Sequence, residues 1–470
     1  MKWNISKRIS NWNDKPIAAA DWIALIIMAT FLFFTVFYAD LIIIYDHSLT
    51  FLDSLFHGDI ANFYSNTLAH PSYDFGAVYY WTPYAIEGIW CLPIYILSKL
   101  FAINTHAVGC YIWIKLGIAL TLVAAIAMMT TILHDFEVTG ERIRFAQFFF
   151  ASSFLVVLPV IAVAQIDIIA IFFMLWGLRE YFKSDKITWK FLLIFSFAAS
   201  LKSFALFAFL PLVFLKEKRI LAAAWDVFVG LWWILACVIP YAWREDYKAS
   251  TAVLNDVMIE RLFSTQLQAG NVDIPIFWAI LVAICIWAYV TNISGKEHYF
   301  VYANWIALAV FAAFFIFVFS HPYWIVLIVP FMTMLILANN VDRKVNMILE
   351  PLISAGCMFV YFGKFGVYLK EINMNLMVLA ASGHPTNNKG YLESATWMIK
   401  HGLDKYYGQA FAVFAVCLVA FLIINKPQKV AVSWAERQRQ TFSFDHGMIY
   451  VRQIMLLVYI LAYLYIGYIA

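Results

Sequence analysis

Residues 144–179 read RFAQFFFASSFLVVLPVIAVAQIDIIAIFFMLWGLR, and the only charge between the two terminal arginines is Asp167. The arginines enclose 34 residues, whereas two full membrane crossings need about 40. Basic residues favour the cytoplasmic side of a membrane, and both ends of this stretch are basic. We therefore expect a short helical hairpin that enters from the cytoplasm and turns back near Asp167.

A second stretch of the same kind follows at residues 190–216. It encloses 25 residues between two lysines, and its only internal charge is Lys202. An ionisable side chain at membrane depth is costly, so each apex charge is a candidate functional group. The alternative for both is structural: Asp167 and Lys202 form a buried ion pair, or Lys202 extends to the membrane surface.

The composition of the whole chain agrees with a membrane protein. Of 470 residues, 64% are hydrophobic and 13% are charged, whereas soluble domains have about 45–50% and about 25%. This excludes a soluble fold. The 32 basic and 29 acidic residues are too balanced and too sparse for a nucleic-acid-binding surface. The six cysteines lie in apolar stretches without CxxC spacing, so we expect neither disulfides nor a metal cluster.

These patterns predict an all-α polytopic membrane protein, a single membrane domain over residues 1–470. Counting each hairpin as two, we expect about 13 transmembrane helices. The long first external loop, 40–106, should contain juxtamembrane helices, and 244–273 and 364–405 form further external loops. Residues 81–101 are apolar but interrupted by Pro83, Glu87 and Pro93, and we expect them not to cross. A crossing there would put Asp40 and Asp167 on opposite sides of the membrane.

Two acidic residues near the start of the first external loop are candidates for catalysis. Asp40 follows 18 uncharged residues, and a carboxylate fixed there beside a cavity could act as a general base toward a hydroxyl group. Its alternative role is to end the helix at the interface. Asp46 is a competitor, and its alternative role is a helix cap, which the helix dipole favours.

Two further candidates lie in later external segments. Arg261 could bind a phosphate through both arms of its guanidinium; alternatively it pairs at the surface with Glu260 or Asp256. His321 and Tyr323 belong to the four-residue turn HPYW at 321–324, and their alternative role is to anchor the turn at the bilayer interface.

The order of these motifs resembles the GT-C superfamily of membrane glycosyltransferases that use polyprenyl-phosphate-linked sugars. The resemblance spans about residues 20–335 and is carried by Asp40 with 80–83 (YWTP), 164–169 (AQIDII), 200–204 (SLKSF), 261–263 (RLF) and 321–324 (HPYW). The chain departs from the family at Ala164, where glycine is usual, and in having a single acidic residue at the span end where some members have Asp-x-Asp. The second departure puts an obligatory metal in doubt.

The resemblance implies a hexosyltransferase that moves a sugar from an undecaprenyl or dolichyl phosphate donor to a hydroxyl of a glycan or lipid-linked acceptor, with inversion, on the extracytoplasmic face. Asp40 would deprotonate the acceptor, while Lys202 and Arg261 would bind the donor phosphate. Donor and acceptor would be oriented by Asp167, His321, Tyr323 and Asp46. No obligatory cofactor is expected, and a divalent metal stays open.

Two other classes remain open from the sequence alone: a transporter or flippase of lipid-linked glycans, and a noncatalytic assembly subunit. Transporters more often carry inverted repeats with matching broken helices, which we do not find. The two N-glycosylation sequons, at 4–6 and 292–294, both fall on the expected cytoplasmic side. This favours a bacterial inner membrane and a role in modifying O-antigen or another surface polysaccharide, although an endoplasmic-reticulum enzyme is an alternative.

Overall fold

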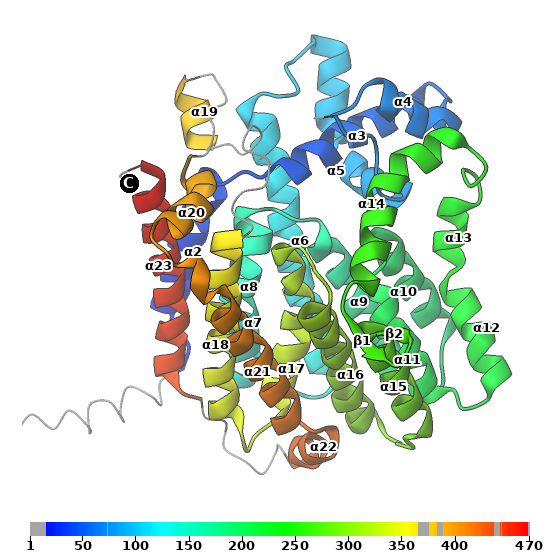
Figure 1. Ribbon diagram of the computed structural model, residues 1–470, viewed down its shortest axis with the longest axis vertical. Coiled ribbons are helices and arrows are strands. Elements are labelled where there is room, and N and C mark those ends of the chain that lie inside the picture. Colours follow the sequence, from blue (N-terminus) through cyan, green and yellow to red (C-terminus); the bar gives the residue numbers. More distant parts are fainter. Residues whose placement is uncertain are drawn as a thin grey trace, which may run out of the picture.

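The computed structural model of the protein describes residues 16–72, 74–138, 140–364, 376–382, 389–436, 442 and 444–468. Within these residues the regular structure is helical except for one two-stranded hairpin. Figure 1 shows the long helices side by side, with α3 (Ala39–Phe56) and α4 (Phe63–Ala69) at one end and α22 (Pro427–Ala435) at the other. We refer to these as the α3 end and the α22 end. The all-α prediction is confirmed.

Several helices are suited to a membrane by length and composition. Five qualify singly, and the number rises to seven when each of two bent pairs counts as one span. The five are α5 (Trp81–Phe101), α6 (Val108–Asp135), α16 (Lys296–Phe317), Asp404–Ile424, which includes η4 (Asp404–Tyr406) and α21 (Tyr407–Ile424), and most of α23 (His446–Tyr468). The chain is therefore built as a multi-pass helical membrane protein.

The two bent pairs and the shorter apolar helices fill the rest of the bundle. One pair joins α7 (Glu141–Ala151) at 54° to α8 (Phe154–Val156) and the π-helical turn η2 (Val157–Ala162). The other joins α12 (Ile220–Gly230) at 44° to α13 (Trp232–Val238). The shorter helices are α2 (Ala19–Thr35), α10 (Trp189–Leu201), α11 (Ala205–Lys216), α15 (Ile276–Val290), and η3 (Pro322–Ile328) with α17 (Val329–Ala338).

Both predicted hairpins turn where the sequence places their charges. The first breaks after η2, and α9 (Asp167–Phe182) begins at Asp167. The second breaks between α10 and α11, where Lys202 has an extended backbone. Neither helix of the second hairpin exceeds 13 residues, about 20 Å of helix at 1.5 Å per residue. Each apex charge is thus held inside the bundle.

Residues 40–106, predicted as the first external loop, form a small layer at the α3 end. It contains α3, η1 (Ile60–Asn62), α4 and α5, and α5 packs along α3. The carboxylate of Asp53 on α3 contacts Tyr95 and Lys99 of α5 at 3.0 and 2.6 Å. Residues 81–101, expected as a juxtamembrane helix that does not cross, form one continuous helix of 21 residues that is long and apolar enough to cross. Pro83 lies in its first turn, where a missing amide hydrogen costs little.

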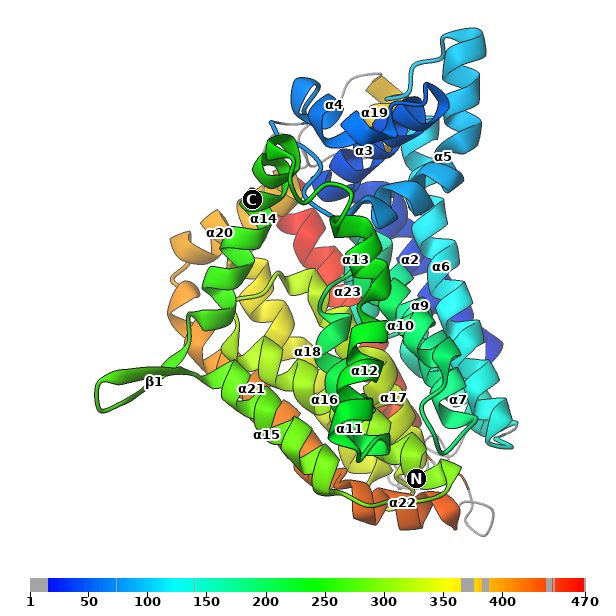
Figure 2. The same ribbon diagram turned by 90° about the vertical axis from the view of Figure 1, so that its right-hand side faces the viewer.

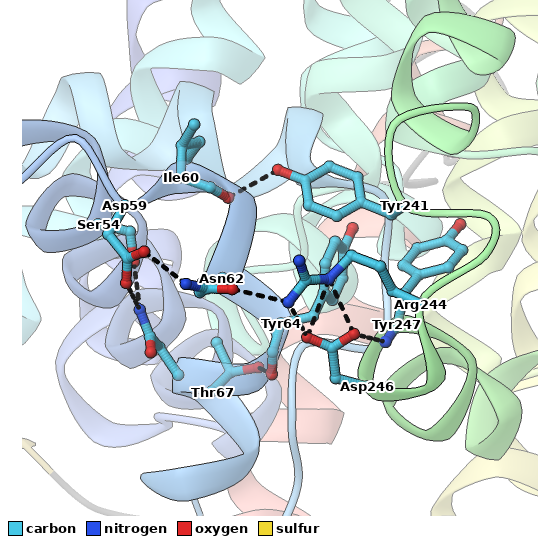
Figure 3. A network of polar contacts seen from close by, with 11 residues as sticks. Ser54, Asp59, Ile60, Asn62, Tyr64, Thr67, Tyr241, Arg244, Asp246 and Tyr247 are labelled. Atoms are coloured by element: carbon cyan, nitrogen blue, oxygen red, sulfur yellow. Dashed lines mark hydrogen bonds and ion pairs between the residues drawn. The ribbon is translucent and has the colours of Figure 1, made fainter.

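A second segment covers this layer. Helix α14 (Glu245–Phe263) starts beside α4, where Arg244 bonds Asn62 at 2.7 Å and Tyr241 donates to the carbonyl of Ile60 at 2.8 Å (Figure 3). It leads into the antiparallel hairpin of β1 (Gln266–Ala269) and β2 (Val272–Pro275), which projects from the side of the bundle (Figure 2). The predicted loop 244–273 is therefore mostly helix.

The C-terminal part closes the bundle against its beginning. Helix α18 (Arg343–Lys364) is followed by α19 (Leu376–Ser382) and α20 (Lys389–Lys400), which fall in the predicted loop 364–405; residues 365–375 and 383–388 of that loop lie outside the described residues. Helix α23 returns to α2 through a 3.3 Å contact between His446 and Asp21, and to α18 through a 3.2 Å contact between Arg452 and Glu350. Because buried charges without partners are costly, these contacts help to fix α23 against α2 and α18, while α20 also packs along it.

Candidate active site

Asp40 lies just beyond the end of α2, in the first turn of α3. Its Oδ2 atom accepts a hydrogen bond of 2.6 Å from the hydroxyl of Tyr323 and one of 3.4 Å from Nε2 of Gln165. Both donors reach the same oxygen, so Oδ1 accepts no side-chain hydrogen bond from the described residues. Asp40 is partly exposed as a residue. One oxygen of its carboxylate is thus oriented by two donors, and the other has no side-chain donor among the described residues.

The surroundings of Asp40 make it a stronger base than an ordinary carboxylate. The dense protein around it raises its pKa above the usual value, and this effect exceeds the opposing effects of the Tyr323 hydrogen bond, the Lys202 charge and the Gln165 hydrogen bond. Burial disfavours the charged form of a carboxyl group. A base works best when its pKa approaches the pH at which it operates.

Asp167 and Lys202 meet at the apices of the two hairpins. Lys202 Nζ lies 3.1 Å from Asp167 Oδ1, and their side chains are 4% and 0% exposed. Aromatic rings surround the ammonium: the ring of Trp324 lies 4.7 Å away and that of Tyr79 lies 5.4 Å away. The structural alternative, a buried ion pair, is therefore realised. It does not exclude a role in binding, because the same ammonium also lines a cavity.

The backbone at Ala164 places the first hairpin's polar groups. Ala164 has φ of 59°, a left-handed conformation that costs an L-residue with a Cβ about 1–2 kcal/mol. The turn ends η2 and lets α9 start at Asp167, so that Gln165 reaches Asp40 while Asp167 reaches Lys202. Glycine adopts this conformation without steric cost, so the position is one that glycine would suit.

The turn at 320–324 contributes a third set of groups. The ring of His321 stacks on Tyr323 with centroids 5.2 Å apart and meets Trp324 edge-on at 4.8 Å. Burial, together with the charges of Arg261 and Lys202, lowers the pKa of His321 to about 3. The imidazole is therefore neutral at physiological pH. Of the two proposed site residues in this turn, only Tyr323 contacts Asp40 directly.

A cavity of about 340 Å³ opens beside Lys202. We call it the Lys202 cavity. Its walls are mainly apolar and come from α11, α14, the segment before α5 and the apex of the second hairpin, which contributes Lys202. Lining residues used below are Lys202, Trp324, Leu254, Met258, Ile259 and Leu262. A cationic group at the end of an apolar cavity suits an amphiphile with an anionic head.

Two predicted site residues lie apart from this cluster. The guanidinium carbon of Arg261 lies 5.0 Å from the ring centre of Phe319, and its charge acts on His321. Asp46 lies within α3, where it accepts a 2.6 Å hydrogen bond from Ser72 and lies 3.9 Å from His106. The expectation that Asp46 caps the helix is wrong, because α3 begins at Ala39 and Asp46 is in its interior. Its contacts tie α3 to the neighbouring loops.

Three residues of the cluster were not singled out from the sequence. Gln165 stands inside the AQIDII motif, so the motif was the available signal; its hydrogen bond to Asp40 makes it a positioning residue. Tyr79 and Trp324 flank Lys202, but aromatic residues near span ends usually serve as interfacial anchors. Nothing local in the sequence distinguishes these two from the other aromatic residues.

The assembled groups can activate a hydroxyl group and hold an anion. Asp40 offers one open carboxylate oxygen, Lys202 a cation, and the adjoining cavity an apolar wall. Among the described residues, no three His, Cys, Asp or Glu side chains come together as metal ligands. Comparisons with protein-family models, with characterised proteins and with solved structures find no match for the chain.

Proposed function

We propose that the protein is a GT-C-type glycosyltransferase that moves a sugar from a polyprenyl-phosphate donor to a hydroxyl group of a glycan or lipid-linked acceptor. The observation that supports this most directly is the Asp40 carboxylate, which has one oriented and one open oxygen and lies in the same cluster as Lys202 and its apolar cavity. Transfer from a lipid phosphate requires a base for the acceptor and a cation for the phosphate, and here Asp40 lies near a lysine that lines an apolar cavity.

The proposed reaction is a single displacement. Oδ1 of Asp40 takes the proton of the acceptor hydroxyl while the acceptor oxygen attacks the anomeric carbon. The bond from that carbon to the phosphate oxygen breaks, and the polyprenyl phosphate leaves with the electron pair. Lys202 stabilises the charge that develops on the leaving phosphate, and Asp167 holds Lys202 in place. One displacement inverts the anomeric configuration.

The same proposal includes topology and location. By length and composition alone, five helices could cross a membrane, or seven when each bent pair counts as one. We propose that 13 pieces enter the membrane, with each bent pair counted as one: α2, α6, α7 with η2, α9, α10, α11, α12 with α13, α15, α16, η3 with α17, α18, α21 and α23. In this proposal α5, although long and apolar enough to cross, lies at the membrane surface against α3. The α3 end then faces the periplasm or the external medium, with a bacterial inner membrane as the favoured host.

The test is a transfer assay with the purified full chain in lipid nanodiscs. Donors are undecaprenyl and dolichyl phosphate hexoses with a labelled sugar, and acceptors come from envelope extracts of the host cell. We expect a new glycosidic bond by mass spectrometry. Asp40→Asn should reduce the rate by about 10²–10⁴-fold, the usual contribution of a general base, without loss of donor binding. The matched control is Asp46→Asn, a carboxylate on the same helix outside the cluster.

Two results would contradict the proposal. Equal rates for Asp40→Asn and the wild type would remove Asp40 from the chemistry. Movement of the labelled lipid across proteoliposomes, with no new bond for any donor tested, would favour the transporter.

A further inference from the structure

The turn at 320–324 separates two cavities. Trp324 lines the Lys202 cavity, whereas Ser320 lines a second cavity of about 360 Å³. Between them, Tyr323 holds Asp40 at 2.6 Å. We call the second cavity the Phe319 groove, after the aromatic residue that adjoins Ser320 in its wall. The candidate base thus contacts, through Tyr323, a short turn whose two ends line the two cavities.

The walls of the Phe319 groove suit an apolar chain. They are formed by the end of α16, the second half of α18 and the start of α21, all of them helices of the bundle. Wall residues used below are Phe319, Val360, Gly408 and Phe411. Apolar pockets of this size bury hydrocarbon groups rather than polar ones.

A cation adjoins the Phe319 wall of the groove. Arg261 lies over Phe319 at 5.0 Å, and no ion pair between it and a carboxylate is found in the described part of the chain. Arg261 is partly exposed. A guanidinium that is stacked on a ring and lacks an acidic partner is arranged to bind a phosphate through two parallel hydrogen bonds.

We infer that the Phe319 groove binds the acceptor and that this acceptor is a phosphate-bearing lipid. The inference rests on the proposed function and makes its acceptor specific. The donor occupies the Lys202 cavity, the acceptor tail lies along the groove, and its phosphate binds Arg261. The acceptor hydroxyl then reaches Asp40 at the shared turn. Arg261, expected from the sequence to bind the donor phosphate, is assigned here to the acceptor.

Photoaffinity labelling tests the groove without requiring any transfer. The probe is hexadecyl phosphate with a diazirine at the end of the chain, applied to the purified full chain, and labelled peptides are identified by mass spectrometry. We expect two saturable regions, one on α14 around Met258 and Ile259 and one on α18 and α21. Undecaprenyl phosphate should displace the probe from α14 at concentrations at least tenfold below those needed at the groove.

Charge dependence separates a specific site from bulk lipid. Arg261→Met should lower groove labelling about tenfold, whereas Lys248→Met, which removes an exposed lysine from the same helix, should leave it unchanged. Equal groove labelling by the uncharged hexadecanol probe, or no effect of Arg261→Met, would mean that the groove holds bulk lipid, and would overturn the inference.

Kinetics connect the groove to the acceptor. Val360→Trp and Gly408→Trp fill the groove, and we expect them to raise the KM for the acceptor at least tenfold with the donor KM unchanged. Leu254→Trp fills the Lys202 cavity, and we expect it to raise the KM for the donor with the acceptor KM unchanged. Full transfer to a water-soluble glycan, unaffected by the groove variants, would overturn the inference and leave the proposed function standing. Two labelled regions without transfer to any acceptor would instead refute the proposed function.

Discussion

The Asp167–Lys202 pair is almost fully buried, so removing either charge should lower the free energy of unfolding by a measurable amount. The two charges are 3.1 Å apart, with side chains 0% and 4% exposed. At that distance their attraction is about 5 kcal/mol for an effective dielectric constant of about 20, and most of it offsets the cost of burying both groups. Removing one partner of such a pair usually costs about 3–5 kcal/mol, because the other charge stays buried and unpaired.

The two single variants should differ in a way that the structure specifies. Asp167→Asn leaves one buried cation, so we expect a loss of about 3 kcal/mol that changes little between pH 7.5 and 5.5. Lys202→Met leaves Asp167 without its partner and also removes the charge that lowers the pKa of Asp40. We expect its loss to be larger, about 4–5 kcal/mol. That loss should shrink as the pH falls, because carboxyl groups that have lost their counter-charge take up protons.

The assay is the free energy of unfolding of the purified protein in mixed micelles, measured by titration with a denaturing detergent. The double variant Asp167→Asn with Lys202→Met should lose at least about 1–2 kcal/mol less unfolding free energy than the sum of the two single losses. The control cycle uses the exposed pair of Glu245 and Lys248 on α14, where we expect a coupling below about 1 kcal/mol. A coupling below 0.5 kcal/mol for the buried pair, or a Lys202→Met loss independent of pH, would refute this reasoning.

Three further predictions concern the surroundings of the site. Tyr323→Phe removes a hydrogen bond that lowers the pKa of Asp40; because Asp40 acts in its charged form, the acid limb of the transfer rate should move to higher pH, and an unmoved pH profile would argue against Asp40 as the base. Ala164→Gly relieves about 1 kcal/mol of left-handed strain and removes a buried methyl group worth about 0.8 kcal/mol, so detergent titration should show stability within about 1 kcal/mol of wild type. Ala164→Val should lose more than about 2 kcal/mol, because a branched side chain fits that conformation poorly; a neutral Val variant would contradict the assigned turn. Arg244→Met breaks the contacts between α14 and the first loop, and hydrogen exchange should quicken in α4 and at the start of α14 but not in α23; uniform protection would show that the network does not hold this layer.

The interruptions in residues 81–101 led to a partly wrong expectation for a physical reason. Prolines inside an apolar run usually end or bend a helix, yet Pro83 falls in the first turn and Pro93 is accommodated within α5. A crossing by residues 81–101 was expected to put Asp40 and Asp167 on opposite sides of the membrane. In the structure Gln165 lies 3.4 Å from Asp40, so the segment before Asp167 and the start of α3 lie together. Asp46 was expected to open the interfacial helix, where the helix dipole favours an acidic residue, but its side chain accepts a hydrogen bond from Ser72, away from the cluster.

The sequence by itself determined the class of the protein and the two hairpin apices. The number of uncharged residues between two basic residues can be compared directly with the number needed to cross the bilayer. That comparison was enough to place Asp167 and Lys202 at the apices of short hairpins. Which polar groups share a site was decided only by the tertiary structure. Asp40 bonds residues 125 and 283 positions away along the chain, and such pairings depend on how the helices pack. The accessibility of Asp40, the enclosure of Lys202 and the two cavities on either side of the 320–324 turn arise from that packing, because no local pattern specifies which distant side chains surround a residue.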